Sequence, residues 1–163
     1  MHLNSYDIMI YFYMKYLRKE SNLKVLDVGS CDVNGTYRPI FKEHEYIGVD
    51  IGAGKNVDFV LDDAYKFPFP DKTFDVILCG QVLEHAEFPW ETMREISRVA
   101  KDGAKIFIVA PNTWVLHRYP LDCYRYNPDD MKALAKYAGL KPIEAGLSKT
   151  RQGVDCYMYA CKN

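Results

Sequence analysis

The strongest constraint on the fold is a glycine turn that follows a short apolar strand near the N-terminus. The turn lies in VLDVGSCDVNG, residues 25–35, where an apolar run to Val28 ends at Gly29. A second apolar run, YIGVD, ends on the carboxylate of Asp50. Glycine lets the backbone approach a ligand closely, and a carboxylate accepts hydrogen bonds from both hydroxyls of a ribose. A glycine turn after one strand and an acid at the tip of the next are typical of a nucleoside-binding α/β site.

Strand and helix patterns alternate along the chain, which predicts a mostly parallel sheet with helices on both faces. Parallel strands are expected at residues 24–28, 46–49, 57–61, 74–79 and 105–110. Two more strands, at 142–147 and 154–161, are expected to pair as an antiparallel hairpin. Helices are expected at 36–42, at 89–101 with Gly103 closing it, and at 128–138 after the cap Asn127. The predicted fold is α/β, a Rossmann-like doubly wound seven-stranded sheet with an antiparallel C-terminal edge.

The bulk composition fits a single domain over residues 1–163. Hydrophobic residues make up 48% of the chain and charged residues 26%, a balance that argues against disorder. The net charge of −1 gives no bulk attraction to nucleic acid, so no nucleic-acid partner is expected. Five cysteines without a CxxC pair favour free thiols in a reducing, cytoplasmic setting and argue against a metal site such as zinc.

The N-terminal region contains the apolar run IMIYFYMKYL, residues 8–17. This run is too short to span a membrane, Lys15 interrupts it, and no signal-peptide cleavage site follows. A helix within residues 1–20 is predicted instead, covering the core, a ligand pocket or a homodimer interface with its aromatic side chains. Those side chains are Tyr6, Tyr11, Phe12, Tyr13 and Tyr16. The chain is therefore expected to be a monomer or a homodimer.

The residues of the glycine turn exclude two common nucleotide sites. From Gly29 the chain reads GSCDVN, which lacks the second and third glycines of the GxGxxG dinucleotide motif. The phosphate-binding pattern GxxxxGK[ST] is also not met. Without these features the turn cannot bind a pyrophosphate well. The remaining candidate ligand is a nucleoside that lacks phosphates.

Several short segments, in the right order and spacing, resemble the class I S-adenosylmethionine-dependent methyltransferases. VLDVGSCDVNG resembles their motif I, and YIGVD resembles their second-strand acid. Residues 61–85 are similar to their adenine loop and fourth strand, and residues 97–111 to the helix, turn and fifth strand that follow. The resemblance covers about residues 25–140. Within the family, HRYPLDCYRYNPDDM, residues 117–131, resembles the signature of a short bacterial-type subgroup whose substrates are largely unassigned.

The resemblance implies a site for S-adenosylmethionine at the strand ends. Asp27 would reach the methionine amino group through water, and Asp50 would hold the ribose hydroxyls. The other implied contacts are Gly29, Ser30 and Cys31 by backbone, Ile51 on the adenine, Asp63 and Ala64 at its edge, and Gly80 and Gln81 at the methionine end. The family usually has glycine where Cys31 stands, so a side chain narrows the turn here.

The three acids also have structural alternatives. Asp50 could cap the next helix. Asp63 could be an ordinary turn residue, and Asp62 is the neighbour that could take its place. Asp27 could make a structural hydrogen bond to the turn, since a buried carboxylate needs a partner.

The candidate catalytic residues are His85, just beyond the fourth strand, and His117 and Asp122, in the long loop at residues 112–127. Each could contact the acceptor or serve as a base, and each could instead be structural. Glu84 could be a helix-start carboxylate. Arg118 and Arg125 could bind an anionic group of the substrate or pair with nearby acids. Arg38 could bind the cofactor carboxylate or be a solvated charge. Tyr119, Tyr124 and Tyr126 could pack the loop onto the sheet.

The expected function is methyl transfer from S-adenosylmethionine to an oxygen or nitrogen of a small-molecule acceptor. The reaction is an in-line displacement in which the protein mainly positions the reactants, and an oxygen acceptor also needs a base. One alternative is a cofactor-binding partner subunit without catalysis, which Cys31 and the lack of a substrate domain permit. The other is an NAD-type oxidoreductase, against which the missing GxGxxG counts.

Overall fold

A seven-stranded sheet with the strand order β3-β2-β1-β4-β5-β7-β6 forms the centre of the computed structural model, which describes residues 3–149 and 153–163. Strands β1 to β5 pair in parallel, and β7 runs antiparallel between β5 and β6. The strands are β1 (Lys24–Val28), β2 (Glu45–Asp50), β3 (Phe59–Val60), β4 (Phe74–Gly80), β5 (Ala100–Thr113), β6 (Leu140–Lys149) and β7 (Val154–Lys162). The predicted fold class and its antiparallel edge are confirmed.

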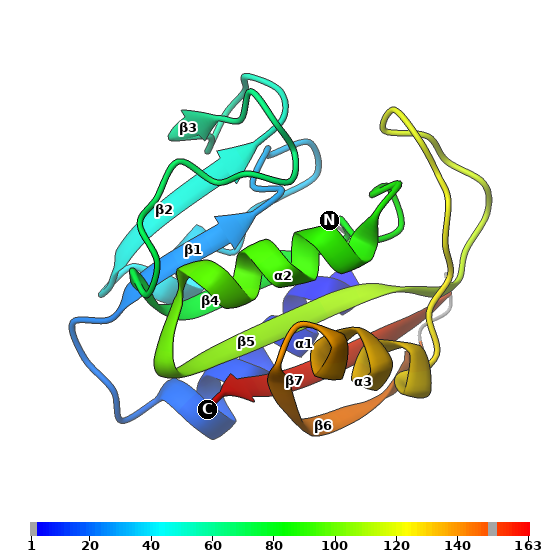
Figure 1. Ribbon diagram of the computed structural model, residues 1–163. Coiled ribbons are helices and arrows are strands. Elements are labelled where there is room, and N and C mark those ends of the chain that lie inside the picture. The colour runs from blue at the N-terminus through cyan, green and yellow to red at the C-terminus, as the bar shows by residue number, and fades with distance from the viewer. Residues whose placement is uncertain (1–2, 150–152) are drawn as a thin grey trace.

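Helices cover both faces of this sheet (Figure 1). On one face lie α2 (Pro89–Val99) and α3 (Pro128–Tyr137). On the other lies α1 (Leu3–Phe12), which continues into the π-helical turn η1 (Tyr13–Leu17). A 3₁₀ turn, η2 (Arg38–Phe41), stands where a short helix was predicted. No helix within the described parts of the chain has the length and apolarity needed to cross a bilayer.

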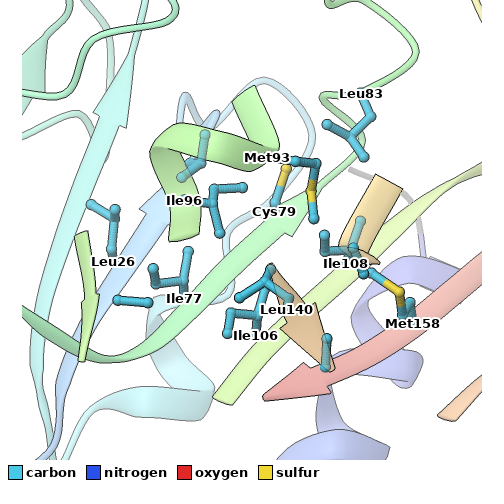
Figure 2. Packing of buried hydrophobic residues seen from close by; sticks show 14 of the residues in the cluster. Leu26, Ile77, Cys79, Leu83, Met93, Ile96, Ile106, Ile108, Leu140 and Met158 are labelled. Carbon is cyan, nitrogen blue, oxygen red and sulfur yellow. The ribbon is translucent and has the colours of Figure 1, made fainter. Parts of the chain in front are cut away.

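The central strand β4 is buried on both faces because its side chains alternate between two apolar clusters. Ile77 and Cys79 point toward α2, as Figure 2 shows, where Met93 and Ile96 of that helix meet them. Val76 and Leu78 belong to the cluster on the opposite face, with α1. Burial of each large side chain stabilises the fold by about 1.5–3 kcal/mol. This packing fixes the position of the carboxyl end of β4 between the helices, and the candidate site begins there.

The first helix packs on the sheet through aromatic side chains. Covering the core was one of the three roles predicted for it. Phe12 is fully buried and stacks on Phe107 of β5, with ring centroids 4.8 Å apart. Tyr16 lies on Tyr159 of β7 at 4.1 Å. Ile10 and Met14 are exposed, so part of the helix faces outward.

Several predicted boundaries were wrong, among them that of the fifth strand, expected at 105–110 and found at Ala100–Thr113. The helix expected to run to residue 101 and close at Gly103 ends at Val99, and β5 begins at once. The turn before β4 is the cause, because the Thr73 N–H donates to the Val99 carbonyl at 2.7 Å and draws the chain into the sheet. The strand expected at 57–61 pairs at only two positions, Phe59 and Val60, because it is the edge strand beside β2.

Candidate active site

A cavity of about 800 Å³ opens at the carboxyl ends of β1, β2 and β4. Its walls are the turn after β1, the tip of β2, the turn after β4 and the loop after β5. The strand order reverses between β1 and β4, and open α/β sheets bind ligands at this point. The volume falls within the range of about 300–1,000 Å³ that is typical of small-molecule sites.

The glycine turn and the β2 acid form one continuous hydrogen-bonded wall. The N–H groups of Gly29 and Ser30 donate to the Val49 carbonyl at 2.9 and 3.0 Å. The Cys31 N–H donates to Oδ2 of Asp50 at 3.0 Å, and the Gly52 N–H donates to Oδ1 at 3.1 Å. Each carboxylate oxygen keeps a further lone pair for a ligand hydroxyl. The backbone donors thus orient Asp50 rather than facing the cavity themselves.

Only glycine fits at position 29. Its φ is +75°, and a Cβ there would lie 2.1 Å from Cγ2 of Val82 in the turn after β4. Cys31, the departure from the usual motif, has its Sγ beside Gly54, where a Cβ would lie 2.5 Å from the sulfur. The Cys31 side chain therefore occupies the space beside Gly54, which is open because Gly54 has no side chain.

Asp27 lies on β1 and is almost completely buried at the cavity wall. The Tyr46 hydroxyl donates to its Oδ2, while Oδ1 has no hydrogen-bond partner within the described residues. Burial raises the pKa of this carboxyl to about 7, against the opposing effect of the tyrosine hydrogen bond. An unpartnered buried carboxylate oxygen on the wall fits a ligand ammonium group, which would satisfy it.

The turn after β4 is held from both sides. A Cβ at Gly80 would lie 2.1 Å from the Tyr37 hydroxyl, so the ring occupies the space behind this glycine. The Gln81 N–H donates to the Val109 carbonyl at 2.7 Å, and its side-chain amide donates to Asp155 at 3.1 Å. Asn4 of α1 donates to the other oxygen of Asp155 at 2.6 Å. The first helix therefore braces one end of the cavity.

Most of the predicted cofactor-binding residues lie on this cavity, but not all. Ile51 and Ala64 line it. Asp63 does not, and its Oδ1 accepts the Tyr65 N–H at 2.8 Å, as in an ordinary turn. Asp62 is exposed and is not on the wall either.

Arg38 also lies away from the cavity. Its guanidinium pairs with Asp58 at 2.6 Å and lies 4.6 Å from the centroid of the Tyr46 ring. The Nε group donates to Asn56 at 2.5 Å. These contacts hold Arg38 beside β2 and the loop that follows it. The arginine therefore does not reach the cavity, where it was one candidate for binding the cofactor carboxylate.

His85 and His117 meet on the opposite wall. Their ring centroids are 4.9 Å apart in an edge-on arrangement, and Tyr119 lies 5.9 Å from His85. Nδ1 of His85 donates to the Leu121 carbonyl at 2.6 Å. Burial lowers the pKa of His85, so the imidazole is neutral at physiological pH. The structure thus brings together two imidazoles from separate segments that were each named as a candidate.

Asp122 organises the loop after β5 instead of lining the cavity. Its buried carboxylate accepts two hydrogen bonds from Arg125, at 2.5 and 2.9 Å, and the His117 N–H at 2.7 Å. The Arg125 guanidinium holds the pKa of this carboxyl below its usual range. Tyr126 ties the loop down by donating to the Leu83 carbonyl at 2.8 Å. Arg118 remains exposed on the cavity wall.

Glu84 is the functional candidate that sequence reasoning placed wrongly. It is not at a helix start, because α2 begins at Pro89, and its side chain is completely buried. Neither carboxylate oxygen has a hydrogen-bond partner within the described residues, and burial raises its pKa to about 8. One of its oxygens, one ring nitrogen of His85 and one ring nitrogen of His117 lie within 4.8 Å of one another. The acid–histidine pair at residues 84–85 was the available signal.

Comparison with known proteins identifies the family. The family described as a methyltransferase domain matches residues 26–108, more than half of the chain. The chain belongs to the methyltransferase domain family. Ajmaline N-methyltransferase of Rauvolfia serpentina is 31% identical over 103 residues, covering 53% of this chain and 35% of that protein. A ubiquinone/menaquinone biosynthesis C-methyltransferase of Pseudomonas savastanoi is 31% identical over 94 residues, covering 56% and 36%.

The chain therefore spans about a third of the length of these two curated relatives. Among solved structures, an N1-methyltransferase of 1,6-didemethyltoxoflavin from Burkholderia thailandensis, crystallised with S-adenosylhomocysteine, has a TM-score of 0.77. It is 16% identical, and the match covers 98% of this methyltransferase domain and 78% of that chain. At this identity the match shows the shared fold. The predicted family is confirmed, and N- and C-methyltransferases both appear among its relatives.

The methyltransferase domain also contains wall residues that were not named as cofactor-binding or catalytic candidates. Tertiary packing alone brings them to the cavity, since they come from separate segments without a common spacing. They include Tyr37, Val82, Thr92, Trp114, Tyr119 and Leu121.

Proposed function

We propose that this methyltransferase domain binds S-adenosylmethionine in the cavity and transfers its methyl group to an oxygen or nitrogen of a small-molecule acceptor. The observation that carries the proposal is the Asp50 carboxylate, oriented by the Cys31 and Gly52 N–H groups at the cavity wall. This is where a ribose would be held by two hydroxyl hydrogen bonds. Family membership supports the same proposal.

The remaining cofactor contacts follow from the positions of the wall residues. The unpartnered Oδ1 of Asp27 would accept the methionine ammonium group, beside Gly80 and Gln81. Ile51 would pack on the adenine, and the Ala64 backbone would face its edge. Asp63 would contribute by shaping the turn that presents Ala64, because its own oxygen is engaged within that turn.

The acceptor would lie on the histidine side of the cavity. When bound, S-adenosylmethionine supplies an electrophilic methyl group on a sulfonium centre. The task of the chain is then to position the acceptor and exclude water. His85 and His117 would contact the reacting atom, and a neutral imidazole can take the proton of an oxygen acceptor. Asp122 would act through the loop, by holding His117 in place.

Calorimetric titration with S-adenosylhomocysteine tests the cofactor assignment. We expect micromolar binding by the intact protein and a loss of at least about 100-fold in Asp50→Ala, because two hydrogen bonds to a charged group are removed. Asp129→Ala is the matched control, since Asp129 is an exposed carboxylate on α3 that pairs with Lys132, away from the cavity walls. This control should bind like the wild type.

Two controls separate the alternatives. Tight binding of NADH in place of S-adenosylhomocysteine would contradict the proposal and support an oxidoreductase. Binding of S-adenosylhomocysteine without turnover on a broad acceptor panel would contradict the catalytic part and support a partner subunit. Failure of the wild type to bind either compound would overturn the cofactor assignment itself.

A further inference from the structure

We propose that Glu84, His85 and His117 bind a divalent transition-metal ion at the acceptor side of the cavity. The three side chains offer one carboxylate oxygen and two imidazole nitrogens, all within 4.8 Å of one another. Nε2 of His85 lies 3.6 Å from Oε1 of Glu84. Two histidines and one carboxylate are a ligand set that transition metals use when further positions stay open.

The buried carboxylate is the observation that points to a ligand. The Glu84 side chain is completely buried, and both of its oxygens lack a hydrogen-bond partner within residues 3–149 and 153–163. A buried polar group without a partner destabilises the folded state, and more so when it is charged. A cation between Glu84 and the two histidines would satisfy both the charge and the lone pairs.

Both imidazoles are already oriented as metal ligands are. Nδ1 of His85 donates to the Leu121 carbonyl at 2.6 Å. Nδ1 of His117 donates to the Val115 carbonyl at 3.2 Å and lies 3.5 Å from Oδ2 of Asp122. A carbonyl accepts only a protonated nitrogen, so Nε2 of each ring keeps its lone pair. Metal-bound histidines characteristically donate their other ring N–H to a carbonyl or carboxylate in this way.

The spacing needs only a small contraction. Ligand atoms about 2.1 Å from one ion in a tetrahedral arrangement lie about 3.4 Å apart. The His85–Glu84 contact is already 3.6 Å, and the whole set spans no more than 4.8 Å. Rotation of partly exposed rings can supply the difference, because the side chains of His85 and His117 are 15% and 27% exposed.

The ligand types select the class of ion. Two imidazoles favour Zn²⁺, Co²⁺ or Fe²⁺ over Mg²⁺, which prefers oxygen ligands. The histidines line the cavity, so the open coordination positions face the space left for the acceptor.

The role of the ion rests on the proposed function, whereas the site does not. An acceptor hydroxyl oxygen bound to the ion would lose its proton to solvent more readily. That oxygen would form a bond to the methyl carbon as the carbon–sulfur bond breaks and its electron pair leaves with sulfur. This role favours an oxygen acceptor over a nitrogen acceptor.

Cobalt titration of the untagged, chelator-treated full chain tests the site. We expect one equivalent of Co²⁺ to bind with visible ligand-field absorption, and Zn²⁺ to displace it. His85→Ala and His117→Ala should each weaken binding at least about tenfold. His44→Ala is the matched control, because His44 lies against Tyr13 and Phe41 away from the cavity. Cys123→Ser, which removes an exposed thiol, should also bind like the wild type.

Three results would overturn the site: no saturable binding by the wild type, equal weakening in His44→Ala, or binding that survives loss of both cavity histidines. Thermal unfolding in chelator checks that each variant is folded, and Glu84→Gln gives an isosteric third ligand variant. Titration of the metal-free wild type with S-adenosylhomocysteine separates the two proposals. Cofactor binding without metal binding would contradict only the metal site, and metal binding without cofactor binding would contradict only the proposed function.

Discussion

A buried carboxylate with an unpartnered oxygen lies at each end of the cavity, Asp27 on the wall itself and Glu84 beside the wall residue His85. The two ends are built in different ways. Asp27 sits on β1 between two parallel neighbours, and a tyrosine satisfies one of its oxygens. Glu84 sits in the irregular turn after β4, and neither of its oxygens has a partner within the described chain. Sheet register fixes the first end, whereas the second depends on a loop held by an ion pair. The end at Asp27 and Asp50, proposed to hold the cofactor, is therefore set by strand pairing, and the end at the two histidines, proposed to hold the acceptor, is set by contacts of a loop. They are called the cofactor end and the acceptor end below in the sense of that proposal.

The largest effect we expect concerns the pH dependence of stability at Asp27. Its folded pKa of about 7 lies above the unfolded value of 3.8, so the folded state holds a proton that the unfolded state has lost. This contribution to the free energy of unfolding is full below pH 4 and declines as the pH rises toward 7. The decline is up to about 4 kcal/mol, at about 1.4 kcal/mol per pH unit.

Urea denaturation of the wild type and Asp27→Asn between pH 4 and 8 measures this contribution as a difference. Asparagine still accepts the Tyr46 hydrogen bond but cannot ionise. Subtracting one profile of unfolding free energy from the other removes the contributions of groups that both proteins share. One of these is Glu84, whose raised pKa also makes the protein less stable as the pH rises. Parallel profiles for the two proteins would show that Asp27 is not held protonated.

The next effect tests whether the cofactor end is rigid. Gly29→Ala should destabilise the protein by about 3 kcal/mol, because it adds a clash with Val82 to the cost of φ +75°. It should also abolish binding of S-adenosylhomocysteine. Gly103→Ala is the matched control, since its φ is +79° but nothing lies within 4 Å of the added Cβ. A control loss of about 1 kcal/mol is expected, and equal losses would refute the clash.

A smaller effect should separate the two ends. Arg125→Met leaves the buried Asp122 without its cation and should cost about 2 kcal/mol, discounted because Arg125 is partly exposed. The lowered pKa of Asp122 means that this pair stabilises the fold above about pH 4 and loses its effect as the pH falls further. Affinity for S-adenosylhomocysteine should stay within about threefold of the wild type.

Chemical denaturation at pH 7 and calorimetry measure both quantities, with Arg94→Met as the control. Arg94 pairs with Glu91 on the exposed side of α2, and its loss should cost less than about 0.5 kcal/mol. A large fall in cofactor affinity in Arg125→Met would mean that the two ends are coupled.

The smallest effect concerns the departure from motif I. Cys31→Gly should change affinity for S-adenosylhomocysteine by no more than about threefold, because the sulfur already sits in the space beside Gly54. Gly54→Ala should have the larger effect, since its Cβ would lie 2.5 Å from that sulfur and push on the turn. A strong gain of affinity in Cys31→Gly would show that the side chain does obstruct the site.

The sequence by itself determined the sheet and the positions of Asp27 and Asp50 at the proposed cofactor end. Apolar runs ending at Val28 and Asp50 define parallel strands whose ends must meet at one edge, and Gly29 must then turn beside them. These relations are local, or follow from strand pairing, so spacing was enough to place Asp27 and Asp50. Helix ends were less certain, because the end of α2 depends on hydrogen bonds from the turn before β4.

Only the tertiary structure decided the acceptor end. Nothing in the spacing of Glu84, His85 and His117 shows that these three side chains meet when the loop after β5 returns over the β4 turn. That return depends on two hydrogen bonds to the β4 turn, from the Tyr126 hydroxyl to the Leu83 carbonyl at 2.8 Å and from the Cys123 N–H to the Glu84 carbonyl at 2.7 Å. Likewise, Asp63 has the side chain expected of an adenine contact, but its Oδ1 accepts the backbone N–H of Tyr65 within a turn. Irregular segments take their course from long-range contacts, and a local pattern does not encode those contacts.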